Sequence, residues 1–186
     1  DGVERSFSQL DPNEVEDIMT IIEEARSYLA QSGSDQWQSD YPNKETIFED
    51  VLQGQGWVGL QDGQLLAYAA VIDGHEPAYD AIYDGKWEHN NHRYITFHRL
   101  ALADSARGQG LALTFLQGLI EGHDGPDFRC DTHEKNKAMQ HILEKLGFHY
   151  CGKVVYEGER LAYQKIKSKA EKGFYQEVDE ADHHVI

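Results

Sequence analysis

The chain of 186 residues is long enough for one domain with a sizeable core. Its 33 acidic and 17 basic residues give a formal net charge of −16, which argues against nucleic-acid binding and favours cationic partners such as amines, although acidity also serves solubility alone. No apolar run is long enough to span a bilayer, no basic-then-apolar signal segment opens the chain, and two cysteines are too few for a disulfide framework. These features favour a cytoplasmic protein that is not associated with a membrane, and we assign no metal ligands.

The first thirty residues predict a strand followed by a helix. The strand is expected over 4–10. Asp11 is suited to cap the helix, Pro12 to occupy its first turn, and Glu14 to complete a capping box. Apolar residues then recur at helical spacing to about residue 30: Val15, Ile18, Ile22, Ala25 and Leu29.

A polar loop and a second helix follow. Trp37 and Tyr41 lie in the loop, where they either cap the core or form a wall of an acceptor pocket. Asn43 or Thr46 starts the second helix, and Gly54 ends it. Segments 57–60 and 65–72 then predict a β-hairpin. Because the second segment is apolar almost throughout, we expect it to be a central strand.

The segment 73–92 interrupts this pattern, and a short helix is expected over 77–83. Acidic and aromatic residues each recur every four positions, which favours two readings: an acceptor-binding insertion with carboxylates for an ammonium group, or a solvated face whose rings pack on the sheet. The acidic set is Glu76, Asp80, Asp84 and Glu88, and the aromatic set is Tyr79, Tyr83 and Trp87.

A fourth strand over 93–102 leads into a glycine-containing turn and a helix predicted from Gly108 to about Gly122. Strand alternation places His98, Leu100 and Leu102 on one face, and Ala101 on the other. The turn Arg107-Gly108-Gln109-Gly110 joins the strand to the helix. Backbone N–H groups at such a joint suit a phosphate or pyrophosphate.

The last third predicts a fifth strand over 128–132, a helix over 136–146 and a hairpin formed by 148–156 and 160–166. The helix has an apolar face, and Gly147 is suited to end it. The segment 168–186 is a charged tail, basic first and then acidic, that we expect to be frayed or partly helical.

Three motifs occur in order in the second half of the chain. Arg107-x-x-Gly110-x-Ala112 follows an apolar strand, Asn136-x-x-Met139 opens a helix, and Leu146-Gly147-Phe148 ends it. The set resembles the signature of the GNAT superfamily of N-acetyltransferases and covers about 4–166. It is neither a nucleotide P-loop nor a dinucleotide fingerprint, because the further residues that those motifs require are missing.

The resemblance implies an α/β (α+β) fold with a GNAT-like mixed, mostly antiparallel sheet of about seven strands, flanked by helices on both faces. A splay between the fourth and fifth strands would admit the cofactor. The domain boundaries that follow are 1–167 for the acetyltransferase domain and 168–186 for the charged C-terminal tail.

The resemblance also implies an acetyl-CoA site. The pantetheine arm would lie along Leu100, Ala101 and Leu102, and Asn136 would reach its side. The pyrophosphate would fall on Arg107, Gly108, Gln109, Gly110, Leu111 and Ala112.

The catalytic groups match the pattern of the superfamily less closely than the cofactor-binding residues do. The general acid usual in the superfamily is a tyrosine, and Leu143 stands at its position here; Tyr150 and Cys151 are nearby substitutes, although each also suits packing. His98 is the first candidate for the base that deprotonates the amine, against a structural role for this histidine. Weaker candidates are Glu76, His75 and Asp80.

These features predict acetyl transfer from acetyl-CoA to a primary amine of a small molecule or peptide, by direct attack in a ternary complex. Two alternatives stay open: a non-catalytic acyl-CoA-binding or sensing module, and an acyltransferase for a longer acyl group. A homodimer formed through the last strands or the tail is compatible with the sequence.

Overall fold

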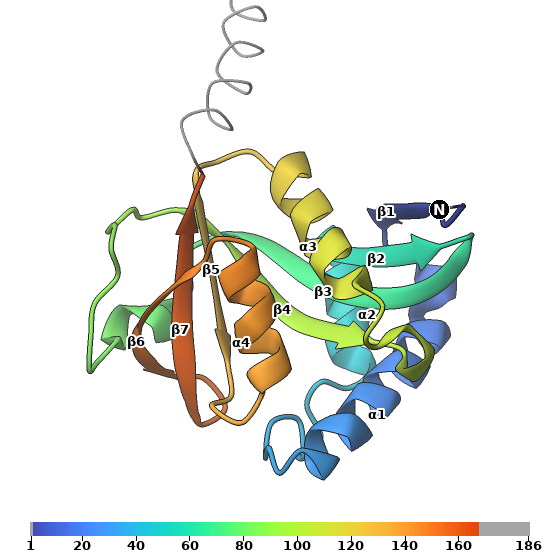
Figure 1. Cartoon of the computed structure of the whole chain (residues 1–186), viewed down its shortest axis with the longest axis horizontal. Helices are drawn as coiled ribbons and strands as arrows, with labels where there is room; N and C mark the ends of the chain where they lie inside the picture. The colour runs from blue at the N-terminus through green and yellow to red at the C-terminus, as the bar shows by residue number, and fades with distance from the viewer. Residues whose placement is uncertain (1, 168–186) are drawn as a thin grey trace, which may run out of the picture.

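The computed structural model describes residues 2–167, so the predicted tail lies outside the described residues. Its centre is an open, twisted, seven-stranded sheet with the strand order β1-β2-β3-β4-β5-β7-β6, as Figure 1 shows. The strands are β1 (Arg5–Gln9), β2 (Gly56–Gln61), β3 (Gln64–Gly74), β4 (Tyr94–Leu102), β5 (Asp127–Thr132), β6 (His149–Val155) and β7 (Glu159–Ile166).

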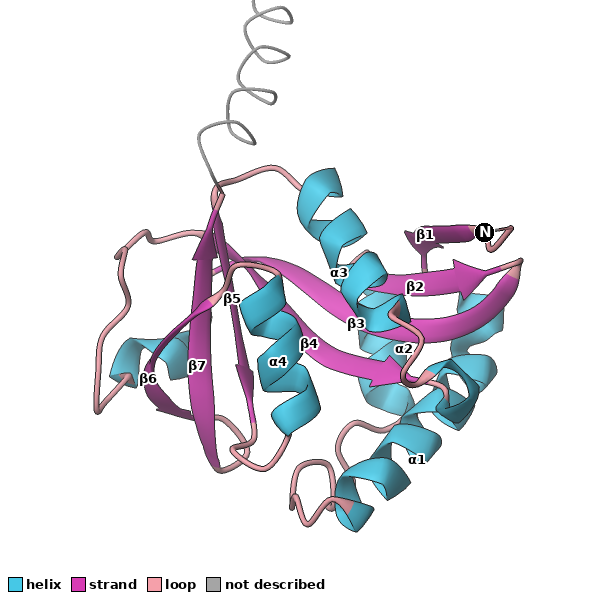
Figure 2. Ribbon diagram, viewed as in Figure 1, coloured by secondary structure: helices cyan, strands magenta, loops and turns pink. Residues whose placement is uncertain are grey.

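Four helices cover the two faces of the sheet (Figure 2). One face carries α1 (Val15–Gln31) and α2 (Lys44–Leu52), and the other carries α3 (Leu111–Gly122) and α4 (Lys137–Lys145). The mixed, mostly antiparallel sheet between two helical layers confirms the predicted fold class. Short 3₁₀ turns occur at Pro12–Glu14, Pro77–Ala81 and Asp104–Ala106.

Local sequence signals set several of these boundaries. The Asp11 side chain accepts the Asn13 N–H at 2.8 Å, and Glu14 accepts the Asp11 N–H at 2.8 Å, which completes the expected capping box. Asn43 caps α2 by accepting the Thr46 N–H at 3.0 Å. The central position of β3, between β2 and β4, is also as predicted.

Strands β4 and β5 share only a short parallel contact. Ile95 pairs with Phe128 and Thr96 with Arg129, and no further pair joins the two strands. Beyond Thr96 the strands part, as Figure 1 shows, which confirms the predicted splay. The backbone of β4 after Thr96 therefore has no strand partner on its β5 side, where an extended ligand can bind.

A β-bulge in β4 changes the expected strand faces. Ala70 pairs with His98 whereas Tyr68 pairs with Ala101, so β4 carries an extra residue, and Arg99 takes a φ of 56°. Residues paired across neighbouring strands share a face, so Ala101 lies on the face of His98 and Leu102 on the opposite one. The predicted alternation is wrong beyond His98 because the bulge reverses it.

The helix predicted from Gly108 begins at Leu111 instead. Gly108 and Gly110 have φ values of 75° and 79°, which right-handed helical residues do not adopt. The two glycines therefore shape an open loop before α3 rather than its first turn.

Among residues 2–167, no helix is long and apolar enough to cross a membrane.

Candidate active site

A groove of about 540 Å³ lies along the unpaired part of β4. Its walls come from α1, β4, the loop before α3, the start of α3, and α4. Arg107, His141 and Lys145 line it, whereas none of its lining residues within 2–167 is an aspartate or a glutamate. In a chain of net charge −16, this local absence of carboxylates makes the groove suitable for an anionic ligand.

The residues implied by the resemblance gather in this groove. Nine of the ten line it: Leu100, Ala101, Leu102, Arg107, Gly108, Gly110, Leu111, Ala112 and Asn136. The tenth, Gln109, holds the loop instead, since its Nε2 donates to the Ser105 carbonyl at 2.8 Å and its own carbonyl accepts from Arg5 at 2.6 Å.

The loop before α3 presents both N–H groups and a positive charge. A Cβ added at Gly108 would meet no atom within 4 Å, so the backbone there is open to a ligand. The Arg107 guanidinium lies 4.0 Å from the centre of the Tyr28 ring and 2.5 Å from Asp104 Oδ1. These contacts hold the cation at the entrance to the helix, where its charge adds to that of the helix dipole.

A second, smaller cavity of about 70 Å³ opens from the groove; we call it the chamber. The two cavities share the lining residues Gln36, Trp37, Leu100, Asn136 and Met139. The chamber is also lined by Tyr41, Phe97, His98, Arg99, Leu116, Cys130, Asp131, Thr132, Leu143, Tyr156, Glu157 and Arg160.

His98 is buried, with 6% of its surface exposed, and it lines the chamber. Its Nε2 is 3.4 Å from Glu76 Oε1, without the alignment of a hydrogen bond, and its ring stacks on Tyr156 with centroids 4.8 Å apart. The contact with His98 lowers the pKa of Glu76. Glu76 therefore places an ionised carboxylate beside the ring.

Tyr156 belongs to a chain of polar contacts that sequence reasoning missed. Its hydroxyl lies 3.5 Å from that of Tyr41, which accepts from Arg99 Nη1 at 2.7 Å. Arg99 in turn contacts Asp50, with distances of 2.6 and 2.9 Å to its two oxygens. Burial raises the pKa of Tyr156, so its hydroxyl stays protonated and can donate.

The other sequence candidates for a proton donor lie away from both cavities. Tyr150 is 49% exposed on the outer strand β6. Cys151 is buried in the small cluster described next, where its Sγ contacts the His149 carbonyl at 3.4 Å.

Leu143 is fully buried and lines the chamber. Cys130 lines it too, but burial raises its pKa well above the usual value, so its thiol is a poor nucleophile.

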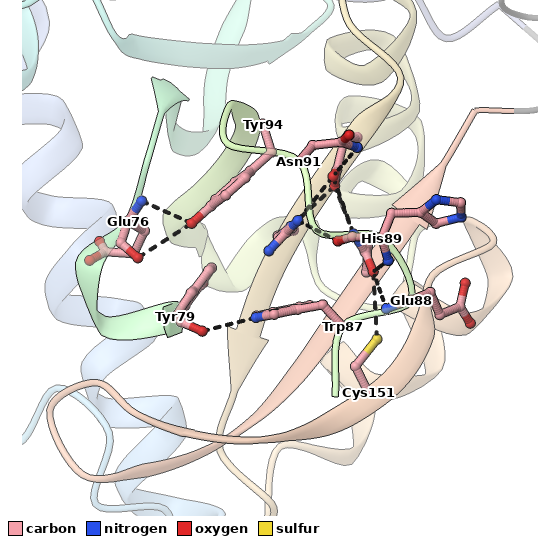
Figure 3. Close-up of polar contacts among 11 residues, drawn as sticks. Glu76, Tyr79, Trp87, Glu88, His89, Asn91, Tyr94 and Cys151 are labelled. Carbon is pink, nitrogen blue, oxygen red and sulfur yellow. Dashed lines mark hydrogen bonds and ion pairs between the residues drawn. The ribbon is translucent and has the colours of Figure 1, made fainter. Parts of the chain in front are cut away.

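The insertion between β3 and β4 divides its residues between the two expected roles. Tyr79, Trp87 and Tyr94 pack into a second hydrophobic cluster. Trp87 Nε1 donates to the Tyr79 carbonyl at 2.9 Å, and the Glu76 N–H donates to Tyr94 Oη at 2.9 Å (Figure 3). The rings therefore serve packing. Among the carboxylates of the insertion, only Glu76 contacts His98. Three others are exposed, namely Asp80, which pairs with His75 at 2.9 Å, Asp84 and Glu88.

Several chamber residues gave no signal in the sequence. Asp131 and Thr132 end β5, and Arg160 opens β7, so each reads as an ordinary strand residue. Gln36 belongs to a polar loop. The splay beside β5 brings the ends of these elements together. The predicted splay, rather than any local pattern, is the feature from which these residues could have been found.

Comparisons with known proteins agree with this geometry. Residues 17–148 match the family model described as "Acetyltransferase (GNAT) family". A crystal structure of a GNAT-family acetyltransferase from Streptococcus agalactiae 2603 is 64% identical, with a TM-score of 0.87 over 89% of this chain and 96% of that one. The chain therefore belongs to the GNAT family of acetyltransferases. Among curated protein sequences, none matches it.

More distant structures share the fold. AAC(6′)-Ib, solved in complex with ribostamycin and coenzyme A, is 17% identical with a TM-score of 0.65, covering 88% of this chain and 94% of that one. Ribosomal-protein-alanine N-acetyltransferase from Brucella melitensis is 20% identical with a TM-score of 0.64, covering 87% and 99%.

Membership of this family makes acetyl-CoA the cosubstrate. The residues present fit it, since the groove offers cations and open backbone N–H groups for the phosphates, and an unpaired strand edge for the extended arm.

Proposed function

We propose that the protein transfers the acetyl group of acetyl-CoA to a primary amine of a small molecule or peptide by direct attack in a ternary complex. The observation that carries this proposal is the junction of the two cavities: a groove lined by no carboxylate meets, at the unpaired edge of β4, a chamber that holds His98. An anionic donor and an amine acceptor can therefore meet at one point of the strand.

His98, Glu76 and Tyr156 have defined tasks in this reaction. When bound, acetyl-CoA supplies an acetyl thioester. His98 takes a proton from the ammonium, so that the nitrogen gains a lone pair, and Glu76 stabilises the resulting imidazolium. As the C–N bond forms and the C–S bond breaks, Tyr156 gives a proton to the leaving sulfur and recovers one from solvent. The amine's second proton and the proton held by His98 then leave to solvent, which regenerates the base.

The backbone supplies the remaining electrostatic support. Beyond Thr96, β4 has no partner on its β5 side, and N–H groups there are free to donate to the carbonyl oxygen as negative charge develops on it. The Arg99–Asp50 ion pair fixes the bulge before any ligand binds. The raised pKa of Cys130 supports direct attack rather than an acetyl-cysteine intermediate.

Calorimetry with acetyl-CoA, run beside CoA release with a pooled amine library, tests the proposal. Binding with turnover supports it. The leucine at position 143, where the superfamily usually has its acid, favours a second candidate, a non-catalytic acyl-CoA sensor, and binding without turnover across the pool would support that candidate instead. No binding would overturn both.

A further inference from the structure

The buried polar atoms without partners converge on the chamber. Within residues 2–167, three buried side-chain atoms have no hydrogen-bond partner: Gln36 Oε1, His98 Nε2 and Thr132 Oγ1. All three residues line the chamber. Because leaving a buried polar group unpaired is destabilising, native proteins hold few of them. His98 Nε2 also lies 3.4 Å from Glu76 Oε1. Gln36 and Thr132 thus leave unpaired polar atoms at residues of one small cavity, which indicates a ligand that supplies their partners.

Two carboxylates line the chamber, and Asp131 is the less exposed of them. Glu157 is exposed, and its Oε1 accepts the Trp37 N–H at 3.1 Å. Of the two arginines there, Arg99 is paired with Asp50, and Arg160 donates to the Glu157 and Glu159 carbonyls. Asp131 accepts one hydrogen bond, from Tyr79 Oη to Oδ2 at 2.6 Å, and among the described residues its Oδ1 accepts none. This free carboxylate oxygen is suited to bind an N–H of a cation.

The volume of the chamber limits what such a cation can be. An apolar cavity of about 150 Å³ holds a benzene molecule. The chamber has about 70 Å³, close to half of that, which is room for about three non-hydrogen atoms. A CH₂–CH₂–NH₃⁺ end fits this space, whereas a carbon branched next to the nitrogen needs more. Aromatic rings favour both a methylene chain and a cation, and four line the chamber: Trp37, Tyr41, Phe97 and Tyr156.

We propose that Asp131 binds the acceptor's ammonium group, with Thr132 and Gln36 as further hydrogen-bond partners. The acceptor is then a primary amine at the end of an unbranched methylene chain. This inference rests on the proposed function, because it names the acceptor of that reaction. Asp131 binds and orients the ammonium, while His98 removes its proton. If the role of Asp131 were structural, replacing it would alter the stability of the fold but not the preference among amines.

The first test uses matched amines. Nα-acetyl-lysine methylamide and Nε-acetyl-lysine methylamide are isomers that present an unbranched and a branched amine. 1-Aminopentane and 2-aminopentane form a second pair, in which both amines are fully protonated near neutral pH. We expect kcat/KM for each unbranched member to exceed that of its partner by about tenfold or more, because overpacking is resisted in a tight site. Equal turnover, or preference for the branched members, would overturn the inference.

The second test uses variants. Asp131→Asn should raise KM for the unbranched amine about 10- to 100-fold, as for a lost charge-assisted hydrogen bond. The Kd for acetyl-CoA, measured by calorimetry, should stay unchanged. Thr132→Val should raise the same KM without lowering the Tm, since it removes a hydroxyl that has no partner. Asp124→Asn, at an exposed position before β5, is the matched control.

The outcomes separate the two proposals. An unchanged amine KM in Asp131→Asn overturns the acceptor seat and leaves the proposed function standing. If the wild-type protein binds acetyl-CoA but acetylates no amine of either pair or of the pool, the proposed function fails and this inference fails with it.

Discussion

The two cavities that meet at β4 differ in their charged residues. The groove is large and presents Arg107 and Lys145, and none of its lining residues within 2–167 is a carboxylate. The chamber is small and holds charges of both signs, with Asp131 and Glu157 beside Arg99 and Arg160. The net charge of the chain does not predict the charged residues that line either cavity. The position of charges, rather than their sum, therefore selects the ligands. Variants that act on one cavity alone can break or sharpen this contrast.

The largest effect is expected from His98→Gln. Loss of the general base should lower kcat about 10²- to 10⁴-fold, with little change in the Kd for acetyl-CoA. Steady-state kinetics and calorimetry measure the two quantities. His75→Gln is the matched control, because His75 pairs with Asp80 at the surface. A normal kcat in His98→Gln would assign the base elsewhere.

Arg107→Glu should act on the groove alone. Replacing the cation by a carboxylate removes a charge-assisted contact with the phosphates, and we expect a rise of about 100-fold in the Kd for acetyl-CoA by calorimetry. The fold should persist, because within the described residues the Arg107 side chain makes its polar contact with Asp104 and its ring contact with Tyr28, and neither partner belongs to a strand. Arg93→Glu reverses a charge in an exposed pair with Asp73 and serves as the control. Unchanged affinity in Arg107→Glu would contradict the assignment of the groove.

Tyr156→Phe tests the proton donor. Its loss should lower kcat about 10- to 100-fold, at the lower end of general acid catalysis, because a thiolate is a good leaving group. Tyr150→Phe removes the same hydroxyl from a residue on the outer strand, and it should leave kcat unchanged. The opposite pattern in the two kinetic measurements would return the role of acid to Tyr150.

The smallest effect concerns stability. Burial raises the pKa of Asp131, although the charges of His98 and Arg160 oppose this shift. The folded protein therefore binds more protons there than the unfolded chain, so its free energy of unfolding falls as the pH rises from the unfolded pKa through the folded one. Asp131→Asn should be more stable by about 0.5–2 kcal/mol at pH 7, and the gain should vanish in acid. Thermal unfolding across pH checks this; a constant difference would contradict it.

The fold was largely readable from the sequence, because its signals are local. The caps at Asp11 and Asn43 and the apolar run of β3 depend on neighbours in the chain. The predicted groove residues were readable as well, since one continuous stretch from β4 to α3 supplies eight of the nine that line it.

The chamber was not readable, because distant contacts create it. Arg99 takes a left-handed conformation that nothing in its local sequence indicates, and Asp50 on α2 holds it there. That bulge reverses the strand faces after His98. Tyr156 and Asp131 reach the chamber only through the order of the strands at the splay. Sequence spacing therefore suggested Tyr150 and Cys151, which lie away from both cavities.

The loop between α1 and α2 has a further consequence. Gln36 and Trp37 line both cavities, and Arg26 holds the loop by donating to four of its backbone carbonyls, those of Trp37, Ser39, Tyr41 and Pro42. A substitution in this shared wall alters both ligands at once. A substitution in β5 or β7 reaches the acceptor alone. Divergence among related enzymes can therefore change the amine through the second half of the sheet while the donor stays the same, whereas the loop, like the other residues shared by both cavities, constrains both ligands together.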